Sequence, residues 1–449
     1  MKSKINKSFL RVLLPIALPI ALQSVIINLL NMIDEIMICQ LGETMITSVS
    51  VANKMTSILN FTLSSLVTAM SIFVSRYNCS ENKHREVNSI LDITILFGGI
   101  IIALGMMISI GFPDMFISFF TTDSEVIVLA SKFLRIIAIS YIPLLFTCVF
   151  SAFMKARLDV KLPVVASIIG VVINVVANYI LIFGKFNFPK LGIIGAGVAT
   201  VLARVVEVLI IIIYVIRTRM LSEIKFSNIR SCNFSLIKPY LNIALPILIS
   251  ELLWVLGDVT YSAIYGRIGT YEYAAIAVLN PIQGVLIGFM SGLSASATVI
   301  IGNLIGENHL EKLKSFTKKY ILTGVLLSIV LSLLLILFIN NYVGLFNIQK
   351  ITCEYAKNIL MLFSIFLVVK VTNMIIGSGI LTSGGDSKFI LIMDGASTWL
   401  IGVPLGLITA YFFKMPIYYV YIFINLEEVI RVIVGVLRIR SMKWIKKLS

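Results

Sequence analysis

Charged residues are scarce in this chain. Of its 449 residues, 13% are Asp, Glu, Lys or Arg, whereas 59% are apolar, and the mean hydropathy is +1.01. A water-soluble chain of this length could not bury so much apolar surface. The composition therefore excludes an ordinary soluble domain and predicts a protein that crosses a membrane several times.

Residue types that commonly bind metals or carry out catalysis are also rare. The two histidines, His84 and His309, lie in polar loops. No Ser-His-Asp or Cys-His set can be assembled, and no GxxxxGK[ST] phosphate-binding loop is present. No cysteine has metal-site or CxxC spacing; they are Cys39, Cys79, Cys148, Cys232 and Cys353.

These absences bound the function. We expect no enzyme activity, no resident metal and no cofactor, and an ion gradient as the energy source. We also expect no cleavable leader: the N-terminus starts like a signal peptide, but no small-residue cleavage site follows and the apolar run continues past residue 30. We therefore interpret this run as the first membrane span.

Long apolar runs make up most of the sequence. Each run is long enough to cross a hydrocarbon core of about 30 Å. The runs are continuous rather than alternating, which favours helices over a β-barrel. The predicted fold class is an all-α membrane protein with twelve transmembrane helices, at 12–38, 46–75, 88–111, 125–151, 162–184, 192–216, 239–265, 273–302, 317–340, 352–381, 389–412 and 416–437.

The chain contains two copies of one apolar unit. The string Ile-Ala-Leu-Pro-Ile occurs at 16–20 and again at 243–247, which is 227 residues later (243 − 16). Asn53 and Asn280 keep the same offset, and no gap is needed. We predict a six-helix N-terminal lobe, a cytoplasmic linker, and a six-helix C-terminal lobe with a short basic tail, at 1–216, 217–238 and 239–449.

Basic residues gather in alternate loops. One set of loops, with both termini, holds 25 Lys and Arg residues, and the opposite set holds 6. The positive-inside rule then predicts a multi-pass plasma-membrane protein with both termini and the linker in the cytoplasm. The net charge of +15 follows from this topology, so it does not indicate a nucleic-acid partner.

Each copy has an even number of spans, so the two copies are predicted to be parallel repeats. Transporters built from such repeats commonly bind substrate in a central cleft between the lobes. They expose the cleft alternately to the two sides of the membrane by rocking one lobe against the other.

The first span carries Gln23, Asn31 and Asp34. The spacing places Asn31 and Asp34 on roughly one helix face near the outer end of the span. Charged groups inside spans are functional candidates because they are costly in lipid. Asp34 is therefore a candidate for ion or proton coupling; the alternative is a carboxylate that reaches the outer interface.

The seventh span carries Glu251 and Asp258, which lie seven residues apart on one stripe with Trp254 between them. Glu251 is near mid-depth, where a carboxylate costs about 3 kcal/mol. Its repeat mate is Ser24, so the duplication does not require an acid. We expect Glu251 to bind a proton or an ion, and Asp258 and Trp254 to line the substrate cleft. Asp258 could instead meet water or pair with Arg267.

Other spans carry further polar candidates. Asn174 and Asn178, one turn apart, either take part in coupling or tie helices together. Lys370, with Asn373 close behind it, is a cleft candidate or forms a salt bridge to one of the acids above. Two pairs are interpreted mainly as structural ties along single helices, and one acid as an interface residue: Arg204–Glu207, Glu427–Arg431 and Asp394.

These residues and motifs resemble the multidrug and toxic compound extrusion (MATE) family of antiporters. The likeness covers essentially the whole chain. It rests on LPIALQ…MIDEIM…QLGE within 18–43, the stretch 178–200, GILTSGGD at 379–386, WLIGVPLG at 399–406 and KW at 443–444. The resemblance implies two six-helix lobes around a central cleft that exports organic cations in exchange for Na⁺ or H⁺.

The resemblance also implies roles for single residues. It places the coupling acid at Asp34, and the Asn and Thr of the family at Asn174 and Thr200. The chain departs from many members at Asn178, where they have Asp. Other members use an acid in helix 7, matched by Glu251, with a partner acid in helix 10 that this chain lacks. The coupling ion is thus expected at Asp34 or Glu251.

The sequence therefore predicts a monomeric, ion-coupled multidrug efflux antiporter that exports organic cations and contacts membrane lipids without an obligatory protein partner. One alternative is a flippase of the same superfamily that moves a lipid-linked saccharide. Such proteins usually line the cavity with several cations, whereas acids and amides predominate here. A channel or receptor is the other alternative, which the duplicated halves and the lack of a filter-like loop disfavour.

Overall fold

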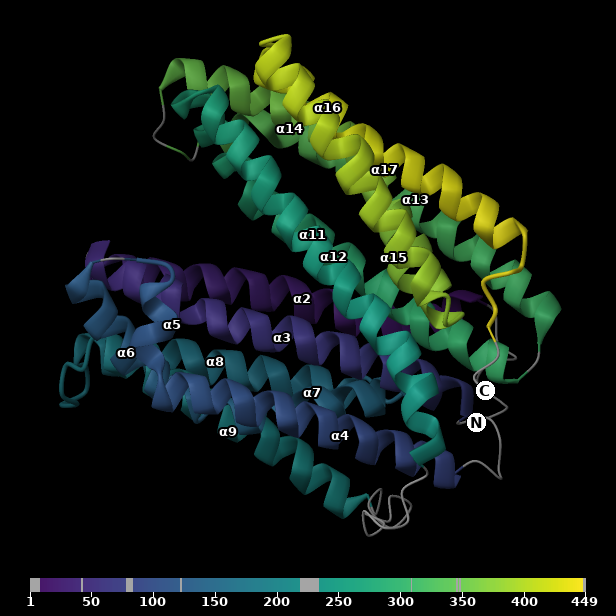
Figure 1. Cartoon of the computed structure of the whole chain (residues 1–449), viewed down its shortest axis with the longest axis horizontal. Helices are drawn as coiled ribbons and strands as arrows, with labels where there is room; N and C mark the ends of the chain where they lie inside the picture. Colours follow the sequence, from purple (N-terminus) through teal and green to yellow (C-terminus); the bar gives the residue numbers. More distant parts are fainter. Residues whose placement is uncertain are drawn as a thin grey trace. The chain divides into compact units, whose positions relative to one another are not determined.

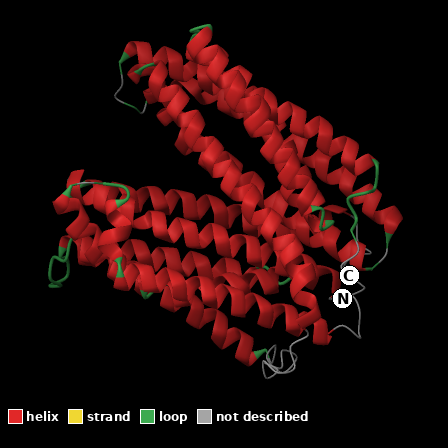
Figure 2. Ribbon diagram, in the orientation of Figure 1, coloured by secondary structure: helices red, strands yellow, loops and turns green. Residues whose placement is uncertain are grey.

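The computed structural model describes residues 9–41, 43–77, 84–121, 123–218, 234–307, 309–344, 346 and 349–446. This part of the chain consists of helices and loops (Figure 2), with no strand assigned in it. Ten described helical segments are long and apolar enough to cross a membrane, and a bent helix pair makes an eleventh. The predicted all-α membrane class is confirmed.

Contacts divide the helices into two compact units. The N-terminal unit (Ile26–Tyr240) begins inside α2 (Phe9–Cys39). One of its hydrophobic clusters lies between the later helices, where Phe150, Met154 and Ile211 are buried together. Its other helices are α3 (Glu43–Tyr77), α4 (His84–Met106), η1 (Met107–Gly111), α5 (Pro113–Ser118), α6 (Ser124–Ala138), α7 (Tyr141–Ala156), α8 (Lys161–Phe183) and α9 (Ile193–Arg217).

The C-terminal unit comprises Met1–Val25 and Leu241–Ser449. In Figure 1 its later helices run from teal to yellow. Two of its long helical segments are interrupted by π-helical turns. In chain order the elements are η3 (Phe234–Leu236), α11 (Ile237–Ile268), α12 (Thr270–Gly306), α13 (Leu310–Val343), α14 (Lys350–Met374), η4 (Ile375–Leu381), α15 (Ser387–Ala396), η5 (Ser397–Gly402), α16 (Val403–Leu407), η6 (Ile408–Phe412) and α17 (Ile417–Arg440), of which η3 and the first turn of α11 precede the unit's boundary.

Each unit includes the start of a helix from the opposite sequence repeat. The first half of α2 packs in the C-terminal unit, where Ser24 Oγ lies 3.3 Å from Ser291 Oγ. The first turn of α11 belongs to the N-terminal unit, where Tyr240 Oη donates to the Leu66 carbonyl at 2.9 Å. The two lobes predicted from the repeat, 1–216 and 239–449, stay a prediction. The units defined by contacts differ from these lobes at the starts of α2 and α11.

The predicted fourth span, 125–151, is wrong as a single helix. The chain bends by 48° between α6 and α7. Pro143, in the first turn of α7, has no backbone N–H to donate to the carbonyl of Ile139, so the helical ladder is interrupted there. Ser140 completes the break, because its hydroxyl donates to the Ile137 carbonyl at 2.6 Å.

The last predicted span, 416–437, corresponds to α17, which has 24 residues. This length suffices to cross a membrane. The helix nevertheless carries Glu427, Glu428 and Arg431, all of which are buried. The charges of α17 are therefore enclosed by neighbouring side chains, which is how ionisable groups persist in a membrane protein.

Local chemistry fixes where several helices begin and end. The Asp123 side chain caps α6 by accepting from the backbone N–H of Glu125 at 2.9 Å. Gly184 ends α8 with φ of +67°, a left-handed conformation that glycine adopts without strain. Next in the chain, α9 packs so closely on α8 that a Cβ on Gly195 would lie 2.7 Å from the backbone of Leu181.

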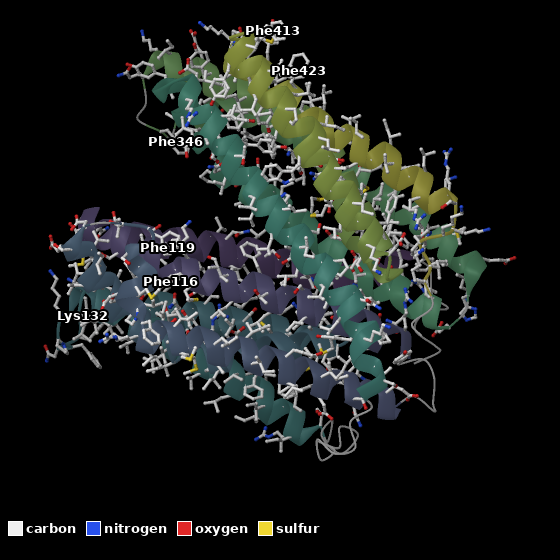
Figure 3. All side chains as sticks on the ribbon, in the orientation of Figure 1. Phe116, Phe119, Lys132, Phe346, Phe413 and Phe423 are labelled. Carbon is white, nitrogen blue, oxygen red and sulfur yellow. The ribbon has the colours of Figure 1, made fainter. Side chains whose placement is uncertain are left out.

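Exposed aromatic side chains mark several helix ends. Phe119 is 87% exposed after α5, and Phe413 is 58% exposed after η6. Figure 3 shows Phe413 at the end of its helical segment.

Candidate functional site

The N-terminal unit brings four of the predicted site residues into one hydrogen-bonded chain. Asn178 Nδ2 donates to Asp34 Oδ1 at 3.0 Å and lies 3.3 Å from Asn174 Oδ1. Asn174 Nδ2 in turn lies 3.5 Å from Thr200 Oγ1. The chain joins α2, α8 and α9. Along these hydrogen bonds, a carboxylate, two amides and a hydroxyl follow one another.

Helix geometry explains why these side chains meet. Asn174 and Asn178 are four residues apart, so they lie one above the other on α8. Helix α9 approaches α8 closely at two glycines, because a Cβ on Gly170 would lie 3.2 Å from Glu207 Cβ, and Gly195 faces the α8 backbone. This close packing brings Thr200 within reach of Asn174.

We call Asp34, Asn174, Asn178 and Thr200 the N-terminal cluster. It contains a buried acceptor atom without a hydrogen-bond partner among the described residues. Asn178 is 3% exposed. Its Oδ1 is buried and has no hydrogen-bond partner among the described residues. A buried polar atom of this kind is costly to leave unsatisfied. Beside a carboxylate, it suits a ligand that brings a donor or a positive charge.

The seventh-span candidates all lie on α11 of the C-terminal unit. Glu251 is half-buried, whereas Asp258 and Trp254 are exposed, Trp254 at 54%. Trp399 Nε1 donates to the Leu253 carbonyl at 3.3 Å, which ties α11 to η5 beside this stripe. The roles expected for these three residues stay predictions.

The remaining cleft candidates have different positions. Gln23 is buried, at 9% exposure, in the first half of α2. The side chain of Asn31 lies outside the described residues. Lys370 and Asn373 lie on α14 and both contact Glu428 of α17, with Lys370 Nζ at 3.4 Å and Asn373 Nδ2 at 2.7 Å. The alternative given for Lys370, a salt bridge to an acid of span 1 or 7, is therefore wrong in its partner, because Lys370 pairs with Glu428.

Five charged residues form a cluster in the C-terminal unit. Arg431 lies between three carboxylates, at 3.3 Å from Glu427, 3.8 Å from Asp394 and 3.9 Å from Glu428. Lys370 adds a second cation through Glu428. We call these residues the C-unit charge cluster: Lys370, Asp394, Glu427, Glu428 and Arg431.

Neutral donors complete the C-unit charge cluster. Tyr261 of α11 donates to Glu427 Oε2 at 2.7 Å, and Ser250 donates to Asp394 Oδ2 at 3.0 Å. With every group ionised, three carboxylates face two cations, which leaves one negative charge in excess. Enclosed by protein within a membrane unit, this charge favours uptake of a proton or a monovalent cation.

The sequence predicts only part of this cluster. The Glu427–Arg431 pair is confirmed, and Asp394 joins it. Its place at a membrane interface stays a prediction. Glu428 and Tyr261 were missed. The signal available for Glu428 was its place beside Glu427, because two successive acids in an apolar span are costly. Tyr261 has no such signal.

The second predicted pair is also confirmed. Arg204 Nη1 lies 3.0 Å from Glu207 Oε2 on α9. Three or more His, Cys, Asp or Glu side chains do not come together in a metal-binding arrangement within the described residues. The candidate sites are therefore a carboxylate–amide chain and a mixed-charge cluster.

Known proteins resemble this chain over half to nearly all of its length. The family model MatE matches it twice, at 19–180 and at 246–408. The two matches start 227 residues apart (246 − 19), the offset of the repeat. YisQ, an uncharacterized transporter of Bacillus subtilis (strain 168), is 22% identical over 416 residues, which is 92% of this chain and 90% of YisQ.

Two further likenesses differ in extent. NorM of Pasteurella multocida (strain Pm70), described as a probable multidrug resistance protein, is 24% identical over 230 residues, 51% of this chain and 49% of NorM. The aligned region thus spans about half the length of that relative. A solved structure of MATE in complex with MaL6 has a TM-score of 0.88 at 18% identity and covers 99% of both chains, which shows the shared fold.

Proposed function

Since this chain belongs to the MatE family and is a multi-pass membrane transporter, we propose that it is a secondary active multidrug efflux antiporter. It exports organic cations in exchange for H⁺ or Na⁺ by alternating access. The observation that carries this proposal is the hydrogen-bonded chain from Asp34 through the buried Asn178 and through Asn174 to Thr200. An ionisable group held by amides inside a membrane unit is suited to reversible ion binding.

The amide of Asn178 supplies the coupling chemistry. With Asp34 ionised, Asn178 Nδ2 donates to Asp34 Oδ1. When Asp34 takes a proton it becomes a donor, for which Asn178 Oδ1 is an acceptor without another described partner. A Na⁺ ion would use the same oxygens as ligands. Either event changes the hydrogen bonds between α2 and α8, so ion binding biases the packing of these helices.

The C-terminal unit contributes negative charge. Glu251 and Asp258 on α11 attract an organic cation, and Trp254, exposed on the same stripe, adds a cation–π contact of about 0.5–2 kcal/mol. The C-unit charge cluster, with one carboxylate in excess, is a second place for a proton or Na⁺. Substrate and ion then compete for negative charge, which couples export of one to uptake of the other.

The remaining properties of the proposal follow the same reasoning. The protein lies in the plasma membrane with both termini in the cytoplasm, because basic residues concentrate in that set of loops. It acts as a monomer, is not an enzyme, and uses no cofactor besides the coupling ion. It needs no nucleic acid and no obligatory protein partner.

The flippase alternative is disfavoured by the balance of charge. Lys370 and Arg431 are the cations of the C-unit charge cluster, and both are paired with carboxylates. They therefore do not present free positive charge to a phosphorylated lipid-linked saccharide. The N-terminal cluster, with Asp34 and two amides, supports a cationic ligand instead.

Ethidium efflux from vesicles tests the proposed function. Inverted vesicles containing the protein receive a pH gradient, a Na⁺ gradient or neither, and ethidium uptake is followed by fluorescence. We expect uptake with at least one gradient and its loss when an ionophore collapses that gradient. Uptake in neither condition, at an expression level confirmed by immunoblot, would exclude an ethidium antiporter.

A further inference from the structure

A cavity lies on the C-terminal unit, and its lining shares no residue with either candidate site. Its volume is about 570 Å³, and it is bounded by α13, α17 and the segment after α17. This size falls within the range of small-molecule sites. Three cations, Lys314, Lys318 and Arg440, belong to its lining, and its other side chains are mainly apolar.

The charged and apolar side chains are separated along the helices. On α13, Lys314 and Lys318 come first, and Leu322 and Val325 follow on the same stripe. From Lys314 to Val325 the helix rises by about 16 Å. On α17 the order is reversed, with Val436 deeper in the helix and Arg440 at its end. The cavity therefore has a cationic end and an apolar end.

The cations at the cavity are available to a ligand. None of Lys314, Lys318 and Arg440 forms an ion pair within the described part of the chain, where Arg438 and Lys446 are bound to Asp386 instead. Trp444, also in the lining, is 1% exposed, and its indole Nε1 has no hydrogen-bond partner among the described residues. The site thus offers three positive charges.

The wall of the cavity is built into the fold. Arg438 donates to Asp386 from Nε at 2.7 Å and from Nη2 at 3.2 Å. Lys446 N donates to the Gly384 carbonyl at 2.9 Å, and Trp444 packs against Gly384. These contacts hold the segment after α17 against the turn before α15, so Trp444 is positioned without a ligand.

We infer that this cavity binds an anionic phospholipid of the cytoplasmic leaflet. Its phosphate lies between Lys314, Lys318 and Arg440, and its acyl chain packs against the apolar side chains deeper on α13 and α17. The positive-inside rule puts the basic end of these helices at the cytoplasmic face, where anionic lipid headgroups lie. The N-terminal octapeptide carries three lysines and no acid, so like charge disfavours it as the occupant.

Native mass spectrometry of the full-length protein in a neutral detergent tests this inference. Dioleoyl phosphatidylglycerol and dioleoyl phosphatidylcholine are titrated separately, and the bound lipids are counted. We expect the wild type to bind phosphatidylglycerol at least tenfold more tightly. In the double variant Lys314→Gln/Lys318→Gln, the affinity for phosphatidylglycerol should fall by about fivefold for each cation removed.

Two further variants locate the site. Lys319→Gln/Lys443→Gln removes the same charge from the same end of the unit, outside the cavity lining, and should keep wild-type affinity. Val436→Trp fills the apolar end without a change of charge and should abolish the preference. Three results would each overturn the inference. They are an equal loss of phosphatidylglycerol affinity in the two double Lys→Gln variants, equal affinity of the wild type for both lipids, and wild-type phosphatidylglycerol binding by Val436→Trp.

A headgroup control separates a lipid from a soluble anion. Glycerol 1-phosphate carries the phosphate without acyl chains. At concentrations that saturate phosphatidylglycerol binding, we expect it not to displace the lipid. Displacement at equal concentration would show a phosphate site without a lipid site and would overturn the assignment.

Discussion

At the scale of single residues, Asp34 is the group on which coupling depends. Asp34→Asn removes the charge, keeps the size, and leaves an oxygen to accept from Asn178. We expect gradient-driven ethidium export to fall to background, with a change in stability of about 1 kcal/mol or less. Export is measured in vesicles, and stability is measured by thermal unfolding.

The exposed acid Asp114 provides the matched control for this change. Asp114→Asn also removes one carboxylate and should export at the wild-type rate. If Asp34→Asn exports as well as the wild type, Asp34 is a residue of the outer interface and the N-terminal cluster has no coupling role.

Glu251 is the second residue with a specific expectation. It is half-buried on α11, and the sequence repeat does not require an acid there. Glu251→Gln should abolish gradient-driven export at matched expression, because the carboxylate that exchanges an ion is lost. Glu354→Gln, which changes an exposed acid on α14, should leave export intact. Normal efflux in Glu251→Gln would leave Glu251 with a structural role alone.

Residue-level prediction from the sequence succeeded where one helix, or the resemblance, supplied the neighbours. Asn174 and Asn178 share a face because they are four residues apart, and Asp34 and Thr200 joined them through family positions. It failed where the partner comes from a distant helix. Lys370 meets Glu428 at a separation of 58 residues, and Tyr261 meets Glu427 at 166. Such contacts depend on helix packing, which periodicity does not encode.

At the scale of elements, the close contact of α8 with α9 positions the N-terminal cluster. A Cβ on Gly195 would lie 2.7 Å from the backbone of Leu181, so Gly195→Ala must push the helices apart. We expect a loss of about 1–3 kcal/mol in stability and reduced export, because Thr200 moves away from Asn174. Thermal unfolding and vesicle export measure the two effects.

Gly99 in α4 is the control for this substitution. A Cβ there would meet no atom within 4 Å, and alanine favours the helix by about 0.5–1 kcal/mol over glycine. Gly99→Ala should therefore be neutral or stabilising. A Gly195→Ala protein as stable as Gly99→Ala would show that the α8–α9 contact tolerates a methyl group.

The contact between α14 and α17 depends on Glu428. Glu428→Gln leaves Lys370 without its ion-pair partner, and removal of one member of a largely buried pair costs about 3 kcal/mol. We expect a lower unfolding temperature, which Lys370→Met in the same chain should largely restore. A double variant no more stable than Glu428→Gln would mean that Glu428 acts mainly through Arg431.

Most helices could be predicted from apolar runs, since a span needs a minimum length of apolar sequence whatever it packs against. Two features of the elements could not. The break before α7 depends on Pro143 and Ser140, which a hydropathy average does not register. The grouping of the first half of α2 with the C-terminal unit depends on packing between distant segments.

At the scale of the whole molecule, the account requires that substrate and ion compete for the same negative charges. A cation bound near Glu251 gains attraction while the carboxylates are ionised, and protonation or Na⁺ binding removes it. The competition is reciprocal, so it is visible in binding to the purified protein without any gradient.

The most direct test of this claim is ethidium binding to the purified protein from pH 5 to 8, with and without Na⁺. The account predicts that wild-type affinity rises with pH, or falls when Na⁺ is added, and that Glu251→Gln flattens the response. An affinity independent of both pH and Na⁺ in the wild type, or an unchanged response in Glu251→Gln, would contradict it.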